Sequence, residues 1–416
     1  MSTIKELLDG VEVEWKQMKD VCIDFIVPMR DRPKIFDGDI PWCRIEDIEG
    51  QYFNESKSSL CVSEEIIKKM NLKVYPTGTV ICSCSASIGS YAINTRPLIT
   101  NQTFIGLVCG NTLINKYLFY YMNTQTKVLQ QLSTTGTIPY ISRKKFEELL
   151  IPIPPLSVQK EIVRILDTFT ELTAELTAEL TARKKQYNYY REQLLSFEEG
   201  KVEWKTLGEI TLPTNNIRWK DNDNTYRYID LTSVSRDTNS IIETSEINAK
   251  NAPSRAQKIV FKNDVIFATT RPTQQRLCLI DDEYSGEIAS TGYCVLRAKT
   301  DEVLPKWIFF HSTSINFKNY VEENQSGSAY PAISDAKLKE FKIPVPPLEE
   351  QVRIVSILDK FDTLTTSISE GLPKEIELRK KQYEYYRDML LTFPSLRAAG
   401  EAIQKSEAIR KNNTTR

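Results

Sequence analysis

The chain has 416 residues, of which 41% are hydrophobic and 26% charged, a composition typical of a globular protein with more than one domain. Its formal net charge of −1 excludes a uniformly basic nucleic-acid-binding protein, so any DNA-binding surface has to be a local patch. The sequence contains no apolar run long enough to span a membrane and begins without a secretion signal, so we expect a cytoplasmic protein that does not contact membranes.

The side chains needed for common catalytic and metal sites are scarce. The eight cysteines form no CxxC pair, and Cys82-x-Cys84 lacks the further ligands of a zinc site. His311 is the only histidine, which argues against Ser-His-Asp or Cys-His chemistry and favours a packed or surface role for this residue. Because methyltransferase, Gly-rich cofactor and phosphate-loop motifs are also missing, we predict no catalytic residue and no metal or cofactor bound by this chain.

The first third of the chain predicts a small α+β domain. Residues 79–83 and 104–108 are β-rich runs bounded by turn residues. Basic, amide and hydroxyl side chains on loops are the groups that reach base edges and phosphates, although each of them could equally be an ordinary exposed residue. The candidate DNA-binding residues here are Arg30, Arg32, Lys34, Ser83, Ser85, Ser87, Thr134, Gly136 and Tyr140.

Residues 157–197 predict one long helix, because they contain no Pro or Gly and carry apolar residues at steps of three and four. Pro154-Pro155 precedes it, and we expect Ser157 to be its N-cap. Within it, Thr173-Ala-Glu-Leu176 is followed by Thr177-Ala-Glu-Leu180. Each such unit would add about 6 Å of helix, so this segment is expected to set the spacing between the flanking domains.

A second variable domain follows, with β-rich runs at residues 265–269 and 293–297. Arg pairs well with guanine and Gln with adenine, which favours the Thr-Thr-Arg-Pro-Thr-Gln-Gln-Arg stretch as a reading loop. The candidate DNA-binding residues here are Arg218, Lys220, Arg271, Gln274, Gln275, Arg276, Ser328 and Tyr330.

The constant parts of the chain occur twice. Trp15-Lys returns as Trp204-Lys, an offset of 204 − 15 = 189. Residues 151–169 return as 343–361 with twelve of nineteen positions identical, and residues 183–197 return as 379–393 with eleven of fifteen identical. The stretches of roughly 20–140 and 205–335 show no comparable match. Two constant and two variable parts thus alternate, which indicates one mechanical role and two different targets.

The two helices, 156–199 and 348–395, are each too long and too apolar along one face to stand alone, so we expect an antiparallel coiled coil between them. Gly371-Leu-Pro373 should break the second helix. The repeated Arg-Lys-Lys-Gln-Tyr-x-Tyr-Tyr block suits either partner docking or the DNA backbone, and its faithful repetition favours docking. The docking candidates are Arg183, Lys184, Tyr187, Tyr190, Arg379, Lys380, Tyr383 and Tyr386.

These repeated blocks resemble the specificity subunit of type I restriction-modification enzymes, and the Thr-Ala-Glu-Leu repeats resemble subclass IC. The resemblance implies a subunit that reads a bipartite, asymmetric site on double-stranded DNA, one half per variable domain. It implies two methyltransferase subunits docked on the helices and motor-nuclease subunits in the full complex. S-adenosylmethionine, ATP and Mg²⁺ would then belong to those partners, which would methylate adenine or cleave DNA.

The predicted fold is therefore α+β, with two globular recognition domains, two long helices and an internal pseudo-twofold repeat. The expected boundaries are 1–155 and 200–347 for the domains, 156–199 and 348–395 for the helices, and 396–416 for a flexible tail. A coiled-coil adaptor without direct DNA readout is the alternative function, although it gives no reason for two large, non-matching inserts at equivalent places.

Overall fold

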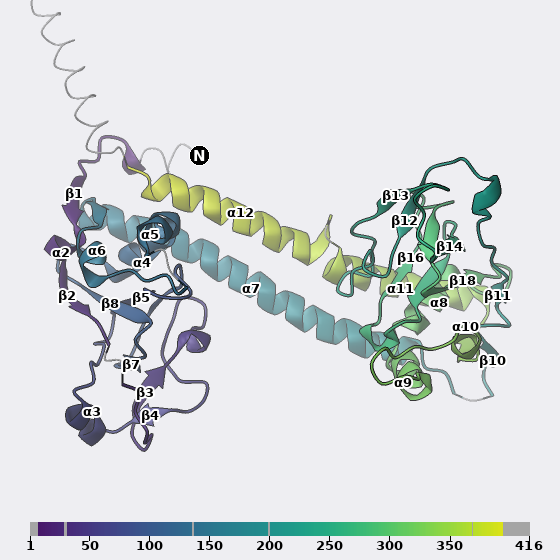
Figure 1. Cartoon of the computed structure of the whole chain (residues 1–416), viewed down its shortest axis with the longest axis horizontal. Helices are drawn as coiled ribbons and strands as arrows, with labels where there is room; N and C mark the ends of the chain where they lie inside the picture. Colours follow the sequence, from purple (N-terminus) through teal and green to yellow (C-terminus); the bar gives the residue numbers. More distant parts are fainter. Residues whose placement is uncertain (1–6, 29–30, 135–136, 199, 368, 394–416) are drawn as a thin grey trace, which may run out of the picture. The chain divides into compact units, whose positions relative to one another are not determined.

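The computed structural model describes residues 7–28, 31–134, 137–198, 200–367 and 369–393. It divides into two compact units (Figure 1). Unit 1 comprises Met1–Thr173 and Arg379–Arg416, and unit 2 comprises Ala174–Leu378. The long helix α7, Leu156–Leu194, therefore contributes its first part to unit 1 and its second part to unit 2.

Unit 1 is built on an antiparallel four-stranded sheet of order β2-β8-β5-β6. A three-stranded sheet, β4-β3-β7, and the β1-β9 pair complete its strands. The strands are β1 (Glu14–Gln17), β2 (Cys22–Ile26), β3 (Ile40–Cys43), β4 (Cys61–Val62), β5 (Val80–Ser83), β6 (Tyr91–Ile93), β7 (Ile99–Thr100), β8 (Phe104–Cys109) and β9 (Leu150–Ile153). The short helices are α2 (Met18–Val21), η1 (Ile45–Asp47), α3 (Glu64–Met70), α4 (Asn115–Thr124), α5 (Thr126–Leu132) and α6 (Arg143–Glu147).

Unit 2 has a corresponding four-stranded sheet, β11-β18-β15-β16, a second sheet, β13-β12-β17-β14, and the β10-β19 pair. Its strands are β10 (Glu203–Thr206), β11 (Thr211–Leu212), β12 (Tyr226–Ile229), β13 (Ser245–Ile247), β14 (Ala256–Ile259), β15 (Val265–Ala268), β16 (Leu277–Leu279), β17 (Ile288–Ser290), β18 (Tyr293–Ala298) and β19 (Lys342–Val345). Its helices are η2 (Trp219–Asp221), η3 (Pro272–Gln274), α8 (Pro305–Ser312), α9 (Ile315–Asn324), α10 (Asp335–Lys339) and α11 (Leu348–Thr366), with α12 (Gly371–Leu391) shared between the units.

The two units repeat one architecture even where their sequences do not match. Each places a parallel strand pair, β3-β7 or β12-β17, in its second sheet. Each also pairs its first strand with the strand before its long helix, so that Trp15 lies opposite Pro152 and Trp204 opposite Pro344. The strands predicted at 79–83, 104–108, 265–269 and 293–297 are confirmed as β5, β8, β15 and β18. The predicted α+β class and the two-domain repeat are thus confirmed.

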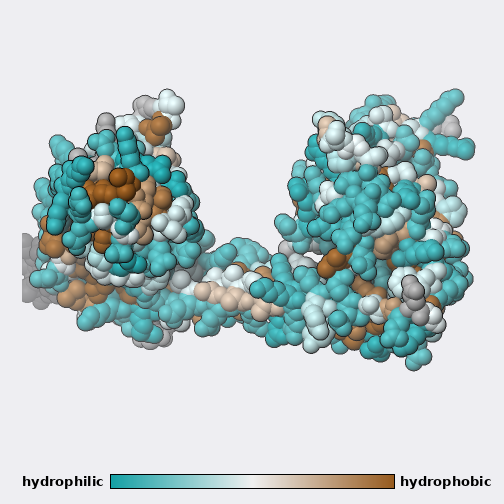
Figure 2. Space-filling model, turned by 90° about the horizontal axis from the view of Figure 1, so that it is seen from below, coloured by the Kyte–Doolittle hydropathy of each residue, from teal (hydrophilic) through white to brown (hydrophobic). Residues whose placement is uncertain are grey.

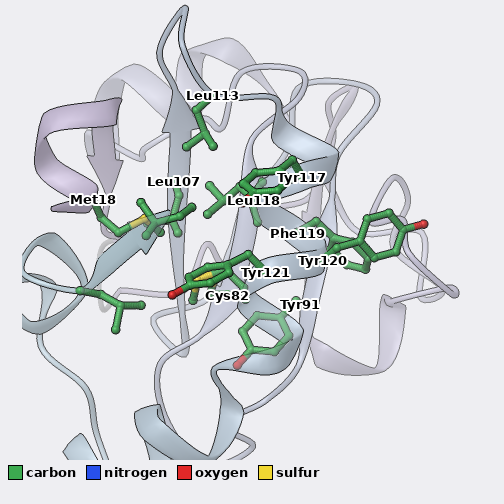
Figure 3. Packing of buried hydrophobic residues seen from close by; sticks show 14 of the residues in the cluster. Met18, Cys82, Tyr91, Leu107, Leu113, Tyr117, Leu118, Phe119, Tyr120 and Tyr121 are labelled. Atoms are coloured by element: carbon green, nitrogen blue, oxygen red, sulfur yellow. The ribbon is translucent and has the colours of Figure 1, made fainter. Parts of the chain in front are cut away.

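The core of unit 1 lies where helix α4 packs on the four-stranded sheet (Figure 3). Tyr117 and Leu118 of α4 are fully buried, together with Leu107 of β8 and Cys82 of β5. The Tyr117 hydroxyl donates a hydrogen bond to the Pro152 carbonyl at 2.9 Å, so this buried polar group is paired. Unit 2 repeats this contact with a different side chain, because Trp307 Nε1 of α8 donates to the Pro344 carbonyl at 2.9 Å.

The repeated glutamine of the Pro-Pro-Leu-x-x-Gln motif joins each long helix to its domain. Gln159 is fully buried, its Nε2 donates to the carbonyls of Thr112 and Pro154, and its Oε1 accepts from Ile114 N–H. Gln351 makes the same three bonds to Glu302, Pro346 and Leu304. Because a buried amide left unpaired is costly, this glutamine locks the start of each helix against the segment that leads into α4 or α8.

The helices depart from the predicted ranges at both ends of the first one and at the end of the second: α7 ends at Leu194 and not at residue 199, and α12 ends at Leu391 and not at residue 395. Helix α7 begins at Leu156 and not after Ser157, because the Pro155 carbonyl already accepts the backbone N–H groups of Val158 and Gln159. The prediction of Ser157 as N-cap is therefore wrong. The break expected at Gly371 is confirmed, since α11 ends at Thr366 and α12 begins at Gly371.

Equivalent aromatic contacts hold the helices together within each unit. In unit 1 the Phe169 ring stacks on Tyr386 with ring centroids 5.2 Å apart. In unit 2 Phe361, the repeat counterpart of Phe169, stacks on Tyr190 at 6.1 Å. Since Tyr190 is the counterpart of Tyr386, the same contact is made twice with the roles of the two helices exchanged.

The single histidine is a buried residue of α8. His311 is 5% exposed, its ring lies 4.9 Å from that of Trp307, and its Nε2 has no hydrogen-bond partner among the described residues. Burial lowers the pKa of His311 to about 3.

We expect this histidine to make unit 2 acid-sensitive. The imidazole of the folded protein stays neutral, whereas that of the unfolded chain titrates near its ordinary pKa. The contribution of His311 to the free energy of unfolding is therefore complete above about pH 6.5 and is lost as pH falls toward 3. The one imidazole resonance in an NMR titration should not shift between pH 5 and 8. H311F should flatten the acid limb of thermal stability, and an unchanged limb would contradict this assignment.

None of the helices in the described part of the chain is long and apolar enough to cross a membrane. The face shown in Figure 2 is mainly hydrophilic, with apolar side chains gathered in small separate patches.

Candidate nucleic-acid interface

Two loops predicted to contact DNA in the first domain lie against each other in unit 1. The loop after β5 meets the Gly-containing loop before α6, with Ser85 and Tyr140 bridged as in an antiparallel sheet. Ile141 N–H donates to the Cys84 carbonyl at 2.8 Å, and Ala86 N–H donates to the Pro139 carbonyl at 3.4 Å. Backbone bonds thus fix the shape of this loop pair and leave its side chains available.

Unit 2 builds the same loop pair from different residues. Thr270 and Ala332 form the equivalent bridge. Ile333 N–H donates to the Thr269 carbonyl at 2.9 Å, and Arg271 N–H donates to the Pro331 carbonyl at 2.7 Å. The loops after β15 and before α10 therefore correspond to those of unit 1, although the inserts share no residue order.

The third residue after β5 and the third residue after β15 both have a left-handed backbone conformation. Ala86 has φ of 57° and Arg271 has φ of 50°. Non-glycine residues adopt this conformation rarely, and they cluster at functional sites when they do. The two loops thus share a strained backbone conformation at an equivalent position, which holds alanine in one unit and arginine in the other. This fits a backbone that is kept constant while its side chains vary.

Arg271 is the best-placed cation of the second loop pair. It is exposed, and its guanidinium lies 5.1 Å from the ring centroid of Tyr330, which is 71% exposed. No side-chain hydrogen bond of Arg271 occurs within the described residues. A cation held by an aromatic face keeps its N–H donors available for a guanine edge or a phosphate.

Its predicted neighbours are more constrained. The Arg276 guanidinium donates to the Val234 carbonyl and, at 3.4 Å, to Gln274 Oε1. Gln275 donates to the Pro272 carbonyl at 3.4 Å. These three side chains are half-buried, so they support the loop as well as lining it.

One predicted contact in unit 1 is wrong on grounds of burial. Ser83 is fully buried and its hydroxyl donates to the Ser85 carbonyl at 3.0 Å, so it shapes the loop from inside. Ser87, by contrast, is exposed. Thr134 is also exposed, and its Oγ1 accepts the Tyr140 N–H at 3.1 Å, which closes the Gly loop.

Among the remaining candidates, Ser328 and Gly136 belong to the two Gly-containing loops in sequence, and the others lie elsewhere in the two domains. Arg32 is exposed, with its guanidinium 5.2 Å from the Trp42 ring centroid. Arg218 and Lys220 flank Trp219, whose Nε1 donates to the Ala256 carbonyl at 2.8 Å. Lys34, Arg218, Lys220 and Ser328 are all exposed, whereas Arg30 and Gly136 lie outside the described residues.

The tyrosines predicted to dock a partner mostly pack within the chain. Tyr187 is 7% exposed and stacks on Phe361, which leaves it no surface for a partner. Tyr383 is half-buried against the unit 1 core. Tyr386 and Tyr190 make the aromatic contacts described above, and Tyr190 keeps 43% of its surface exposed.

The basic residues of the block differ in their environment. Arg183 pairs with Glu179 at 3.4 Å and donates to Gln186, and Arg379 donates to Gln382. Lys184 and Lys380 are exposed.

The most exposed tyrosine of each block was missed in the sequence analysis. Tyr189 is 62% and Tyr385 is 60% exposed, and the two are counterparts at an offset of 196. Helical spacing could have found them, because Tyr187 and Tyr190 fall on the apolar stripe and Tyr189 does not.

Two units of one fold, each presenting a loop pair of constant backbone and variable side chains, define a duplicated recognition protein. The chain belongs to the family described as type I restriction modification DNA specificity domain, whose model matches residues 11–183 and 200–378. The two matched segments correspond to the two repeats recognised in the sequence.

Curated relatives extend over nearly the whole chain. The EcoR124I/EcoR124II specificity subunit of Escherichia coli is 34% identical over 418 residues, covering 95% of this chain and 98% of the relative. The EcoprrI specificity subunit of Escherichia coli is 34% identical over 390 residues, covering 89% and 92%. The crystal structure of the type I restriction-modification S subunit from M. genitalium matches with a TM-score of 0.54 at 16% identity, covering 92% and 97%, and supports the fold.

Proposed function

We propose that this chain is the DNA-recognition subunit of a type I restriction-modification complex and reads a bipartite, asymmetric site, one half with each unit. The observation that carries the proposal is the repeated loop pair, in which an equivalent left-handed position holds Ala86 in one unit and Arg271 in the other. One backbone frame with two sets of side chains is what reading two different half-sites requires. The relatives named as specificity subunits support the same function.

In this proposal catalysis belongs to partner subunits. Methyltransferase subunits, two per chain, would methylate adenine, and motor-nuclease subunits would cleave DNA. S-adenosylmethionine, ATP and Mg²⁺ would bind to those partners. The repeat of the constant segments supports two methyltransferase copies, because each constant segment is present twice.

A footprint of the assembled complex tests DNA recognition against the adaptor alternative. With the methyltransferase partner present, we expect two protected segments separated by a constant gap on one DNA sequence. An intact complex that protects no specific sequence would favour the adaptor.

We further propose that α7 pairs with α11 and α12 as an antiparallel coiled coil, with a spacer of the subclass IC type. Support comes from the reciprocal aromatic stacking within each unit, Phe169 on Tyr386 and Phe361 on Tyr190. Hydroxyls in the spacer bond back into the helix, as Thr181 Oγ1 does to the Thr177 carbonyl at 2.9 Å. The repeat can therefore be lengthened without a change in helix type.

Insertion of one further Thr-Ala-Glu-Leu unit after Leu180 should widen the gap in the recognised site and leave both half-sites unchanged. Four residues add about 6 Å of helix, equivalent to roughly one to two base-pair steps. Methylation mapping of the insertion variant measures the gap. A variant that methylates with the original gap would contradict the role of this segment as spacer.

A further inference from the structure

Each Gly-containing loop carries one large, exposed side chain directly before its proline. Ile138 is 64% exposed and Tyr330 is 71% exposed. The two positions are equivalent, because the carbonyls of Pro139 and Pro331 accept the N–H groups of the two left-handed residues described above. Single exposed apolar side chains are common on protein surfaces. Here, however, one position is large and exposed in two inserts whose sequences otherwise do not match, which indicates a role common to both units.

The backbone presents both side chains in a fixed way. In unit 1 the Thr134 N–H donates to the Tyr140 carbonyl at 3.0 Å and closes the loop at its base. In unit 2 the Ser326 N–H donates to the Ala332 carbonyl at 2.8 Å and does the same. The proline that follows each exposed residue restricts it to extended conformations. A side chain that is held in advance in this way loses little conformational entropy on binding.

The two side chains share bulk and not hydrogen-bonding groups. Isoleucine has no polar side-chain atom, so Ile138 and Tyr330 have no hydrogen bond to a base edge in common. Both are large enough to pack against the faces of stacked bases, and isoleucine is among the apolar side chains that proteins insert between base steps. The Arg271 guanidinium lies over the Tyr330 ring, 5.1 Å from its centroid, and adds a contact that holds this ring in place.

Methylation of a base in duplex DNA calls for such a side chain. The atom to be methylated is out of reach until its base leaves the stack, and unstacking costs free energy. An apolar side chain that enters the opened step offsets part of this cost. In the proposed function each half-site is served by one methyltransferase subunit, and each unit offers one side chain of this kind.

We infer that Ile138 and Tyr330 are wedge residues, which enter the base stack of the two half-sites beside the adenine to be methylated and fill the space that this adenine leaves. The inference rests on the proposed function and deepens it, because it adds the opening of the DNA to its recognition. Ile138 and Tyr330 are positioning residues in this account, since the methyl group is transferred by the partner subunit.

Alanine variants of the assembled complex test the wedge on duplexes that carry the motif methylated by the wild-type complex. In one duplex 2-aminopurine, whose fluorescence rises when it leaves the base stack, replaces the target adenine of one half-site. I138A should lose most of the rise at one half-site and methylate its adenine about 10- to 100-fold more slowly, while the other adenine is unaffected. Y330A should do the same at the opposite half-site.

Matched controls separate the wedge position from exposed apolar surface in general. Ile23 is 75% exposed in unit 1 and Ile242 is 63% exposed in unit 2, and neither belongs to a Gly-containing loop. I23A and I242A should therefore keep the fluorescence rise and both methylation rates of the wild type. Y330F keeps the ring and should also behave as wild type. Wild-type fluorescence and rates in I138A or in Y330A would overturn the inference.

A loosened target distinguishes a wedge from a base contact and from a folding defect. An abasic residue opposite the target adenine lowers the cost of unstacking, so the deficit of I138A and Y330A should shrink on this duplex. Loss of a thymine-methyl contact would instead relax selectivity at one base pair. A locally misfolded loop would weaken binding equally on both duplexes. Either of these two results would overturn the inference.

The failure of this inference is distinguishable from failure of the proposed function. Site-specific methylation by the wild-type complex reports on DNA recognition whatever the two alanine variants do. A wild-type complex that methylates a split motif, together with I138A and Y330A complexes that methylate it equally fast, would retain the function and lose only the wedge.

Discussion

Replacement of Arg271 by alanine should weaken binding of the cognate site by about 1–3 kcal/mol and relax selectivity at one position of the second half-site. Arg271 is exposed at a left-handed backbone position, and its guanidinium is held over the Tyr330 ring. A bidentate arginine contact to guanine has this magnitude, whereas a phosphate contact would weaken all sequences alike. Binding to the cognate site and to its single-base variants separates the two cases.

Two further variants sharpen the test. R271K keeps the charge but loses the fork of donors, so it should resemble R271A if the residue reads a base and wild type if it touches a phosphate. R255A removes an exposed arginine of the same unit and serves as the control. If the R271A complex bound DNA with unchanged affinity and selectivity, this loop would not be part of the DNA interface.

Replacement of Gln159 by leucine should destabilise unit 1 by about 3–5 kcal/mol. The side chain is fully buried and pairs three backbone groups, the carbonyls of Thr112 and Pro154 and the N–H of Ile114. Leucine has nearly the same volume but leaves all three unpaired, and each unpaired buried group costs about 1–3 kcal/mol. Urea unfolding of the full chain measures the loss.

The control for this variant lies on the same helix. Gln193 is exposed on α7, so Q193L should change the free energy of unfolding by less than about 0.5 kcal/mol. Q351L should affect unit 2 as Q159L affects unit 1, because Gln351 makes the equivalent bonds. A Q159L chain that unfolds like Q193L would show that the backbone groups find other partners.

The repeat made the frame predictable from sequence. The duplicated Pro-Pro-Leu-x-x-Gln and Arg-Lys-Lys-Gln-Tyr blocks indicate both helices, but α7 ends at Leu194 and α12 at Leu391, short of the predicted residues 199 and 395. The preference for serine at the N-cap places the start of α7 at Ser157, whereas the helix begins at Leu156 and Pro155 occupies the N-cap position, its carbonyl accepting the first intrahelical N–H groups. These bonds are made by a backbone carbonyl, so side-chain preferences for the N-cap do not reveal them.

The sequence predicts which types of residue and which loops form the candidate DNA interface, but not how the loops pair. Ser85 and the Thr134–Tyr140 loop were chosen separately, and only the structure shows that they pair, because the bonds between them are made by backbone groups. The hydroxyl of Ser83 suggests a DNA contact, but β5 is buried along its whole length and Ser83 lies inside the domain. The correspondence of Ala86 with Arg271 was out of reach, since it is a match of backbone conformation without a match of sequence.

The central claim is that two structurally equivalent units read two different DNA half-sites. Its most direct test is to co-express the full chain with its methyltransferase subunit in a methylation-free host and to map methylated adenines across the genome. The account predicts one split motif with two dissimilar halves and a fixed gap. An intact complex that leaves the genome unmethylated, or that methylates without a split motif, would contradict it.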